Sequence, residues 1–156
     1  MKIRIATEAD FEAVKWLINT AFEVERFFKA EDRVNSPMLQ EYFTKGIFLV
    51  SEEGNLTGCV YVELRGQRAY LGLLSVDPSR QKSGIGRRLT AAAEEFARES
   101  GAHFMDIRVV NLRTELPPIY EKLGYKITGT EPFPAEQMPI SMPCHFISMS
   151  KELGHR

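Results

Sequence analysis

The sequence predicts an α+β protein in which helices flank a mixed, mostly antiparallel sheet of about seven strands. The length of 156 residues suits one domain, which we expect to span residues 1–156. Hydrophobic residues make up 44% and charged residues 26%, the balance of a folded protein and not of a disordered, collagen-like or coiled-coil chain. Strand and helix patterns follow in the order β-α-α-β-β-β-α-β-α-β-β, which is neither all-β nor strictly alternating.

The N-terminal part predicts one strand and two helices. Residues 2–6 alternate apolar and charged, as a half-buried strand does. The segment from Thr7 to Asp10 resembles a capping box with Asp in place of the usual Glu, so a helix should follow it. Its apolar face is formed by Phe11, Val14, Leu17, Ile18 and Ala21. A second short helix is expected over Pro37–Lys45, ended by Gly46.

Three strands should follow as an antiparallel meander. They cover Ile47–Glu52, Leu56–Leu64 and Ala69–Val76, and short turns that contain Gly54 and Gly66 join them. A helix with a buried stripe from Ile85 to Phe96 comes next, with Gly101 at its C-terminal end. The remaining predicted elements are a strand over His103–Val110, a helix over Pro118–Leu123, a strand over Tyr125–Gly129, a Pro-rich loop over Glu131–Pro143 and a strand over Cys144–Ser150.

The charge balance argues against a nucleic-acid or membrane-surface protein. Twenty Lys and Arg against 21 Asp and Glu give a net charge of −1. Cys59 and Cys144 are too few for a disulfide scaffold and match no metal motif, so we expect buried, reduced thiols. The start of the chain lacks the apolar stretch of a signal peptide, and no window reaches the 18 apolar residues of a membrane span. These features predict a cytoplasmic protein.

The most informative segment lies between the third meander strand and the following helix. The strand ends at Val76, a polar loop follows, and Gly84 and Gly86 lie where the helix begins. The free N–H groups of a first helical turn bind anions such as phosphate. Positive charge around this turn comes from Arg80, Lys82, Arg87 and Arg88. The segment predicts a pyrophosphate-bearing ligand; the alternative is a tight strand–helix connection with a solvated basic rim.

Two other phosphate motifs do not fit this loop. A P-loop requires Lys and then Ser or Thr after its last glycine, whereas Arg87 and Arg88 follow Gly86. A dinucleotide-binding fingerprint requires a third glycine, and Leu89 occupies that position. The loop therefore belongs to another class of phosphate site.

The segment Gln81-Lys82-Ser83-Gly84-Ile85-Gly86 resembles the Gln/Arg-x-x-Gly-x-Gly/Ala signature of the GNAT superfamily of acyl-CoA-dependent N-acetyltransferases. The preceding strand resembles that family's fourth strand. Downstream, Asn111 and the segment Tyr120-Glu121-Lys122-Leu123-Gly124-Tyr125 resemble its second motif. The resemblance covers residues 2 to about 151. It implies the GNAT fold, whose sheet is splayed between the fourth and fifth strands.

The resemblance also implies acetyl-CoA as cosubstrate, with no metal. The pyrophosphate would lie on Gln81, Lys82, Ser83, Gly84, Ile85, Gly86 and Arg87. The pantetheine arm would pair with the backbone of Leu74, Ser75 and Val76, in the manner of an added strand. Asn111 matches a position that often contacts the pantetheine; otherwise it is a strand-end turn residue.

The implied reaction is direct attack of a primary amine of a small molecule or peptide on the thioester, without a covalent acyl-enzyme. Tyr120 matches the family's acid, which protonates the leaving thiolate; the alternative is a core aromatic residue. Glu63 is the first candidate for the base, or is an exposed strand-end carboxylate. A backbone N–H near Val76 should stabilise the oxyanion. Cys59 has no nearby His to activate it as a nucleophile.

Competing functions are a non-catalytic acyl-CoA-binding or regulatory module and a nucleic-acid binder that uses the basic cluster; the net charge argues against the second. The segment Phe22–Asp32 lies where the family builds its acceptor site, and its acidic residues would attract a cationic amine or form a solvated loop. These acids are Glu23, Glu25, Glu31 and Asp32. The loop Glu131–Pro143 would cover the acceptor site or mediate a homodimer, and His145 would titrate near neutral pH or pack in its strand.

Overall fold

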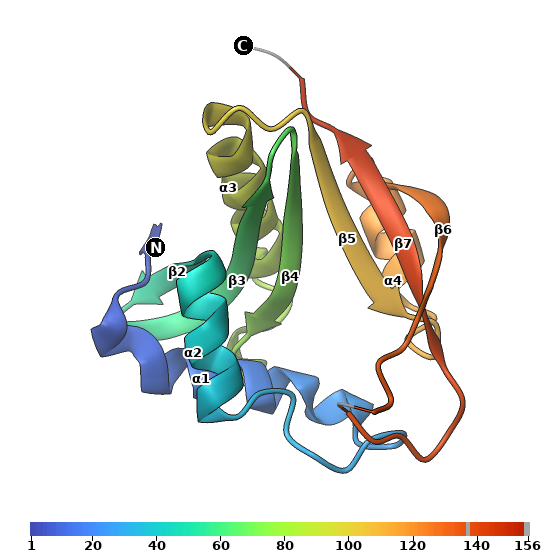
Figure 1. The fold of residues 1–156 in the computed structure, drawn as a ribbon. Helices are drawn as coiled ribbons and strands as arrows, with labels where there is room; N and C mark the ends of the chain where they lie inside the picture. The colour runs from blue at the N-terminus through green and yellow to red at the C-terminus, as the bar shows by residue number, and fades with distance from the viewer. Residues whose placement is uncertain (137, 155–156) are drawn as a thin grey trace.

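The computed structural model describes residues 1–136 and 138–154, and this part of the chain forms a seven-stranded sheet in the order β1-β2-β3-β4-β5-β7-β6 (Figure 1). All neighbouring strands are antiparallel except β4 and β5, which are parallel. The predicted mixed, mostly antiparallel sheet is confirmed. The strands are β1 (Lys2–Ile5), β2 (Ile47–Glu53), β3 (Asn55–Arg65), β4 (Arg68–Val76), β5 (Phe104–Val110), β6 (Lys126–Pro132) and β7 (His145–Glu152).

Helices cover both faces of this sheet. The α-helices are α1 (Phe11–Ala21), α2 (Ser36–Lys45), α3 (Ile85–Glu99) and α4 (Leu116–Lys122), and 3₁₀ turns cover Glu8–Asp10, Phe22–Glu25 and Pro78–Arg80. In Figure 1, α2 lies in front of the sheet, whereas α3 and α4 lie behind it. The strand residues alternate accordingly, because Phe48 and Tyr61 pack with α1, whereas Leu49 and Val60 pack with α3. The sheet therefore has a hydrophobic core on each face.

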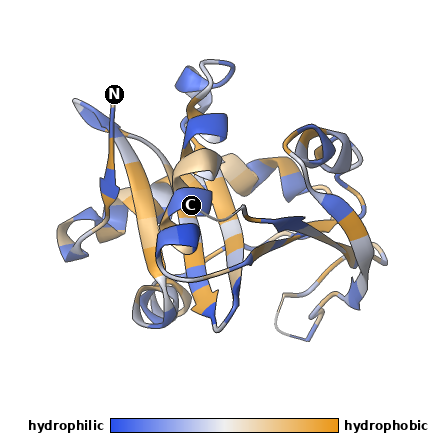
Figure 2. Ribbon diagram, turned by 90° about the horizontal axis from the view of Figure 1, so that it is seen from above, coloured by the Kyte–Doolittle hydropathy of each residue, from blue (hydrophilic) through white to orange (hydrophobic). Residues whose placement is uncertain are grey.

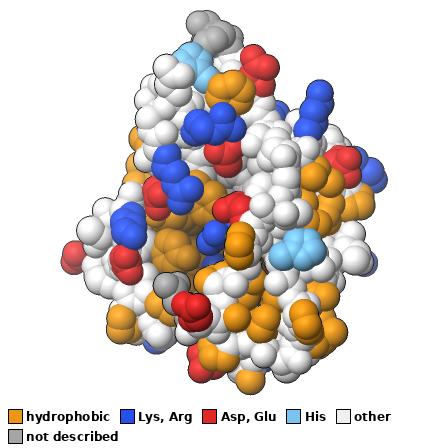
Figure 3. Space-filling view, turned by 45° about the vertical axis from the view of Figure 1, so that its right-hand side comes forward, with side chains coloured by type: hydrophobic (Ala, Val, Ile, Leu, Met, Phe, Trp, Pro, Cys, Tyr) orange, Lys and Arg blue, Asp and Glu red, His pale blue; other side chains and the backbone are white. Residues whose placement is uncertain are grey.

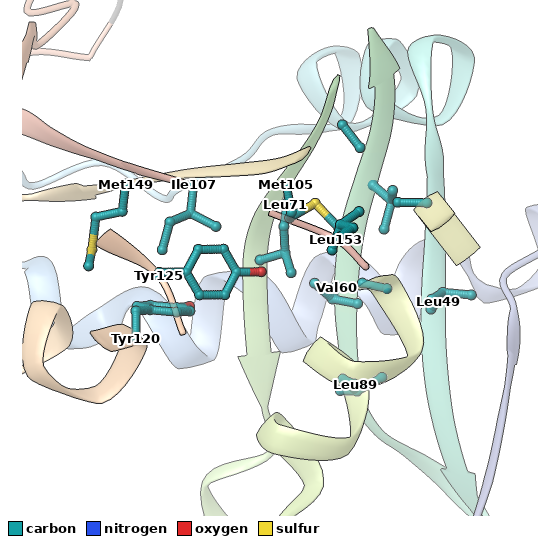
Figure 4. Packing of buried hydrophobic residues seen from close by; sticks show 14 of the residues in the cluster. Leu49, Val60, Leu71, Leu89, Met105, Ile107, Tyr120, Tyr125, Met149 and Leu153 are labelled. Atoms are coloured by element: carbon teal, nitrogen blue, oxygen red, sulfur yellow. The ribbon is translucent and has the colours of Figure 1, made fainter. Parts of the chain in front are cut away.

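The larger core lies between the sheet and α3 (Figure 4). Leu89 of α3 packs there with Val60 and Leu71 of the sheet, and the cluster extends across β5 and β7 to Tyr120 and Tyr125. Figure 2 shows hydrophobic residues gathered in the central strands. The two halves of the sheet are thus joined by one buried cluster on the α3 side, although the strands between them diverge.

The divergence lies between β4 and β5. These strands pair only where Arg68–Tyr70 meets Phe104–Asp106, and beyond that point no ladder joins them. Figure 1 shows the two strands close together near the sheet's upper end and wide apart below. The splay that the family resemblance implies is therefore confirmed, and it leaves backbone groups of both strands free to pair with something else.

A β-bulge in β4 lies beside this opening. From the pair Cys59–Ser75 to the pair Tyr61–Gly72, β3 advances by two residues and β4 by three. Leu73 has a φ of +53°, a conformation that residues other than glycine rarely adopt. The extra residue lacks a partner on β3, and it lies in the part of β4 that does not pair with β5. The sequence analysis missed this bulge, although Gly72 inside a strand pattern is a known sign of one.

Strand ends differ from expectation by one to three residues, and β6 runs past its predicted end at Gly129 to Pro132 because Glu131 and Pro132 pair with β7. Two helix starts also differ, for clear reasons. The α4 helix begins at Leu116 and not at Pro118, because its prolines fill the first turn, where no backbone N–H is needed. The α2 helix begins at Ser36, since the Asn35 side chain accepts a hydrogen bond from the Met38 N–H at 2.9 Å. The Thr7–Asp10 cap forms as expected, with the Thr7 N–H donating to Asp10 Oδ2 at 2.8 Å.

Candidate active site

A continuous groove of about 830 Å³ runs through the splay between β4 and β5. One end is formed by the loop before α3 and by the start of that helix, and the middle by β4, β5 and α4. The other end is formed by the segment after α1 and by Phe133, Met138 and Phe146. Figure 3 shows a hollow lined by hydrophobic side chains with charged side chains around it.

The loop end of the groove is shaped by two left-handed residues. Lys82 has a φ of +67° and Gly84, the N-cap of α3, a φ of +83°. The preceding turn is fixed by Asp77, whose carboxylate accepts a hydrogen bond from the Ser79 N–H at 2.9 Å. The first N–H groups of α3 have no partner within the helix. The loop therefore presents backbone donors toward the groove at the positive end of the helix dipole.

The same end carries uncompensated positive charge. Lys82 and Arg87 line the groove, and neither forms an ion pair with a described residue. Arg80 lies 3.5 Å from the Glu53 carboxylate at the exposed rim. Within the described part of the chain, the only acidic residue that lines any of the groove is Glu25, at the opposite end. The loop end is thus built to hold an anion.

Most of the predicted cosubstrate residues line this groove. They are Leu74, Val76, Gln81, Lys82, Gly84, Ile85, Gly86 and Arg87. Ser75 does not, because its side chain is buried on the other face of β4, where its hydroxyl donates to the Leu73 carbonyl at 3.0 Å. Ser83 also lies outside the lining, with its hydroxyl donating to the Arg80 carbonyl.

Tyr120 lies in the middle of the groove on α4. Its ring packs edge-on against Tyr125, with 5.7 Å between the ring centroids (Figure 4). Its side chain is buried, but its hydroxyl makes no hydrogen bond to any described residue. Burial raises the pKa of this phenol to about 12. Tyr120 is therefore a neutral O–H donor that faces the groove without a protein acceptor.

Asn111 and Glu63 do not line the groove. The Asn111 side chain accepts a hydrogen bond from the His145 N–H at 2.8 Å and so ties the end of β5 to the start of β7. The Glu63 carboxylate accepts hydrogen bonds from Tyr61 at 2.6 Å and from Arg65 at 2.5 Å. Partial burial opposes the effect, but these two donors lower the pKa of Glu63. The structure therefore does not bring either residue together with Tyr120.

Two of the four acidic side chains in the segment Phe22–Asp32 form ion pairs with cations of the chain. Glu25 is buried between two cations, with Lys29 Nζ at 2.8 Å and Arg113 Nη1 at 3.1 Å from its oxygens. Asp32 is paired with Arg26 at the surface. The other two acids of the segment, Glu23 and Glu31, are exposed and do not line the groove. The expected acidic attraction for a cationic amine is thus absent from the described groove.

The loop before β7 forms a wall of the groove. Phe133 and Met138 line it, and the Ser141 N–H donates to the Phe28 carbonyl at 2.8 Å. His145 is exposed at the start of β7 and does not line the groove. Two groove residues that the sequence analysis missed are Tyr70 on β4 and Arg108 on β5, which line the groove where these strands diverge.

Other chemistry is limited in the described residues. Cys59 is fully buried, and burial raises the pKa of its thiol to about 12, so it is not a thiolate at neutral pH. Residues 1–136 and 138–154 contain no group of three or more His, Cys, Asp or Glu side chains placed to hold a metal ion. No helix in these ranges has the length and apolar character needed to span a membrane.

Comparisons with known proteins agree with this architecture. The model of the acetyltransferase (GNAT) family matches residues 11–125. The mycothiol acetyltransferase of Propionibacterium freudenreichii subsp. shermanii is 30% identical over 108 residues, which are 65% of this chain and 34% of that protein. The chain thus spans about a third of the length of this relative.

Solved structures share the fold across the full length. The ribosomal-protein-S18-alanine N-acetyltransferase from Escherichia coli superposes with a TM-score of 0.79 at 15% identity, covering 99% of this chain and 95% of that one. An aminoglycoside 6′-N-acetyltransferase complexed with coenzyme A gives a TM-score of 0.78 at 19% identity, covering 100% and 99%. At these identities the likeness concerns the fold.

Proposed function

The chain belongs to the GNAT family of acetyltransferases, and from this premise we propose that it transfers the acetyl group of acetyl-CoA to a primary amine of a small molecule or peptide. One observation carries the proposal: a single groove joins a cationic, N–H-rich loop to an unpartnered phenol through two splayed strands. A donor with a pyrophosphate at one end and a thioester at the other matches this arrangement.

The donor site follows from the groove's chemistry. Acetyl-CoA would place its pyrophosphate on the N–H groups and cations from Gln81 to Arg87. Its pantetheine amides would pair with the free backbone of β4 beside Leu74 and Val76. The complex of an aminoglycoside 6′-N-acetyltransferase with coenzyme A supports a donor of this kind on the shared fold. The side chains of three predicted residues would make no contact with the donor in the groove and would only help to shape the site. These residues are Ser75, Ser83 and Asn111.

The chemical steps require little beyond these groups. The amine attacks the thioester carbonyl carbon directly, and the C–S bond then breaks to give an acetamide and a thiol. The backbone at the Leu73 bulge would hold the oxyanion, close to the predicted position near Val76. Tyr120 donates its proton to the leaving sulfur, for which a neutral phenol is suited. No acyl-enzyme is needed, and the buried Cys59 thiol takes no part.

Removal of the amine's proton is assigned to Glu63 acting through water. Its carboxylate accepts a hydrogen bond from the Tyr61 hydroxyl, and the partner of Glu63 across β3 and β4 is the groove residue Tyr70. This route keeps the base outside the groove, so at least one water must connect it to the amine. The cytoplasmic location stays a prediction from the sequence, and a homodimer stays an expectation from the family resemblance.

The Tyr120→Phe variant tests the reaction. We expect kcat for thiol release from acetyl-CoA, measured over a panel of primary amines, to fall by about 10²-fold because the general acid is lost while its ring packing remains. Tyr42→Phe is the matched control, since this tyrosine lies on α2 outside the groove. An unchanged rate in Tyr120→Phe would remove Tyr120 from the mechanism. Saturable acetyl-CoA binding without acetylation of any amine would favour a non-catalytic binding module.

A further inference from the structure

The acceptor end of the groove is positively charged. Its charged lining residues in the described chain are Glu25, Lys29, Arg33, Arg108 and Arg113. Glu25 contacts both Lys29 and Arg113, but its single negative charge neutralises only one of the four positive charges. Glu115, which does not line the groove, pairs with Arg113 at 2.9 Å. The guanidinium groups of Arg33 and Arg108 lie over aromatic rings and form no ion pair with a described residue. Because the walls are otherwise apolar, this excess charge acts in poorly screened surroundings.

Arg108 is the arginine placed to bind a ligand. Its guanidinium lies 4.4 Å from the ring centroid of Phe146 and 5.7 Å from that of Tyr70, and it is half-buried. No carboxylate of a described residue pairs with it, whereas its neighbour Arg68 binds Asp106 through two bonds of 2.8 and 2.6 Å. A guanidinium that is fixed by stacking and has its N–H donors unused is preorganised for a planar anion.

Arg108 is on the side of the sheet opposite the donor loop. Its β5 neighbours Ile107 and Val109 belong to the core shared with α3, so by alternation the Arg108 side chain points to the other face. That face carries Tyr70, and Arg108 also borders a polar cavity of about 330 Å³ there. The donor's phosphates have their own cations at the start of α3. Arg108 is therefore available to the acceptor.

The distance to the reacting centre is short. The Tyr70 ring, which neighbours Arg108, lies so close to Gly72 that a Cβ atom there would be 2.7 Å from it. Gly72 precedes the bulge residue Leu73, where the thioester carbonyl is expected. One aromatic ring thus separates the Arg108 guanidinium from the reacting position, so an anionic group on the acceptor must lie within a few bonds of its amine.

We propose that the acceptor is a small amine that carries a carboxylate close to the amino group, and that Arg108 binds this carboxylate. Arg33, which forms no ion pair with a described residue, adds positive potential at this end of the groove. This inference rests on the proposed acetyltransferase function and specifies its substrate class. Polycationic acceptors such as an aminoglycoside would meet like charge at this end of the groove and are disfavoured.

Matched amine pairs test the proposal. Amino acids and their carboxamides present the same amine, with and without the negative charge, and spermidine supplies a polycation. We expect a higher kcat/KM for the acids, measured as thiol release from acetyl-CoA. The amide has the more acidic ammonium group and so the larger free-amine fraction, which means that protonation cannot produce this preference.

Variants assign the preference to Arg108. In Arg108→Gln the acid-to-amide ratio of kcat/KM should fall about tenfold to a hundredfold, the factor for losing a hydrogen bond to a charged group. Arg108→Lys should retain part of the ratio and guards against a folding defect, which the melting temperature reports. Lys126→Gln is the control, because it removes an exposed cation from β6 outside both cavities and should leave the ratio unchanged.

A binding measurement separates the two proposals. With saturating coenzyme A present, the acid should raise the melting temperature more than its amide does, even if no turnover occurs. Such binding without thiol release from any amine would overturn the proposed function and leave the acceptor assignment standing. Equal binding and turnover of acids and amides, faster turnover of spermidine, or a ratio unaffected by Arg108→Gln would overturn the acceptor assignment.

Discussion

At the scale of single residues, the surroundings of Tyr120 decide its chemistry. Its ring is held by Tyr125 and its hydroxyl faces the groove without a protein partner. Burial disfavours the phenolate and raises the pKa to about 12, so the group keeps its proton throughout the neutral and mildly alkaline range. The donor role needs this protonated form.

The pH dependence of turnover follows from that value. A group with a raised pKa stays protonated until the pH nears about 12, so loss of the Tyr120 proton should not lower kcat between pH 8 and pH 10. Thiol release measured at saturating substrates over this range checks the expectation. A fall in kcat with an apparent pKa near 9 in the wild type, absent from Tyr120→Phe, would contradict it.

Residue types in the sequence indicated the donor side better than the acceptor side. The motif with Gly84 and Gly86 and the motif with Tyr120 are each local in sequence, so both can be recognised without knowledge of the fold. The fate of Glu25 is not local, because one of its partners, Arg113, is 88 residues away along the chain. Arg108 had no distinguishing neighbour in sequence, and only the splay exposes it to the groove. The surroundings of Glu25 and Arg108 depend on long-range pairing, which a single sequence does not display.

At the scale of elements, the two glycines at the start of α3 have different tasks. Gly84 has a φ of +83°, so a side chain there is strained. Gly86 is inside the helix, and a Cβ there would have its nearest neighbour, Val76 Cγ2, at 3.7 Å. The fold therefore requires glycine at position 84 but not at position 86. The small residue at position 86, where the family signature has glycine or alanine, is explained instead by close approach of a ligand to the helix start.

Alanine substitutions should separate these tasks in the free protein. Gly84→Ala should lower the free energy of unfolding by about 1–2 kcal/mol through backbone strain. Gly86→Ala should leave it unchanged or raise it by up to about 1 kcal/mol, because alanine favours helix. Urea denaturation of both variants without ligand makes the comparison. A loss in Gly86→Ala as large as that in Gly84→Ala would mean that Gly86 serves the fold alone.

The junction of β1 and α1 makes a separate prediction. Arg4 donates to both oxygens of Asp10, at 2.8 and 3.0 Å, and lowers the pKa of this carboxyl to about 2. Because the Asp10 pKa is lower in the folded protein, its carboxylate stabilises the fold at pH values above about 4, which is its pKa in the unfolded chain. This stabilisation is lost as the pH falls toward 2. Asp10→Asn should therefore cost about 2 kcal/mol of unfolding free energy at pH 7.

Denaturation of Asp10→Asn and the wild type at pH 7 and pH 2 provides the check. The stability difference should shrink as the pH falls from 4 to 2, because the wild-type carboxyl then becomes neutral too. A difference that is constant across this range would show that the carboxylate charge is not what stabilises the junction.

Element types were predictable because each rests on local patterning. The capping segment at Thr7, the meander strands and the stripe of α3 all follow side-chain periods and turn residues. The bulge at Leu73 was missed because it depends on a register offset with β3 that no local period records. The start of α4 was predicted two residues too late, because Leu116 and Pro117 were left out of the helix although they occupy its first turn.

At the scale of the molecule, the splay of β4 and β5 makes the groove. The strands stay together at one end through Arg68–Tyr70 and Phe104–Asp106, while the core beside α3 holds the two halves of the sheet at a fixed separation. The donor loop and the acceptor end then lie on opposite faces of one opening. The family resemblance predicted this splay, whereas the strand patterns did not. A splay depends on where two strands that are distant in sequence stop pairing, and the pattern within each strand does not record this.

A thermal titration with acetyl-CoA tests most directly whether this groove is a cosubstrate site. At 100 times Kd the ligand should add about 2.7 kcal/mol of stability and raise the melting temperature by several degrees, with no such rise from ATP at the same concentration. Gly86→Glu, which places a large carboxylate in the first turn of α3, should still melt cooperatively when free but lose most of the rise, because its side chain fills the helix start and repels the pyrophosphate. No acetyl-CoA shift in the folded wild type, or an equal shift in Gly86→Glu, would contradict the site.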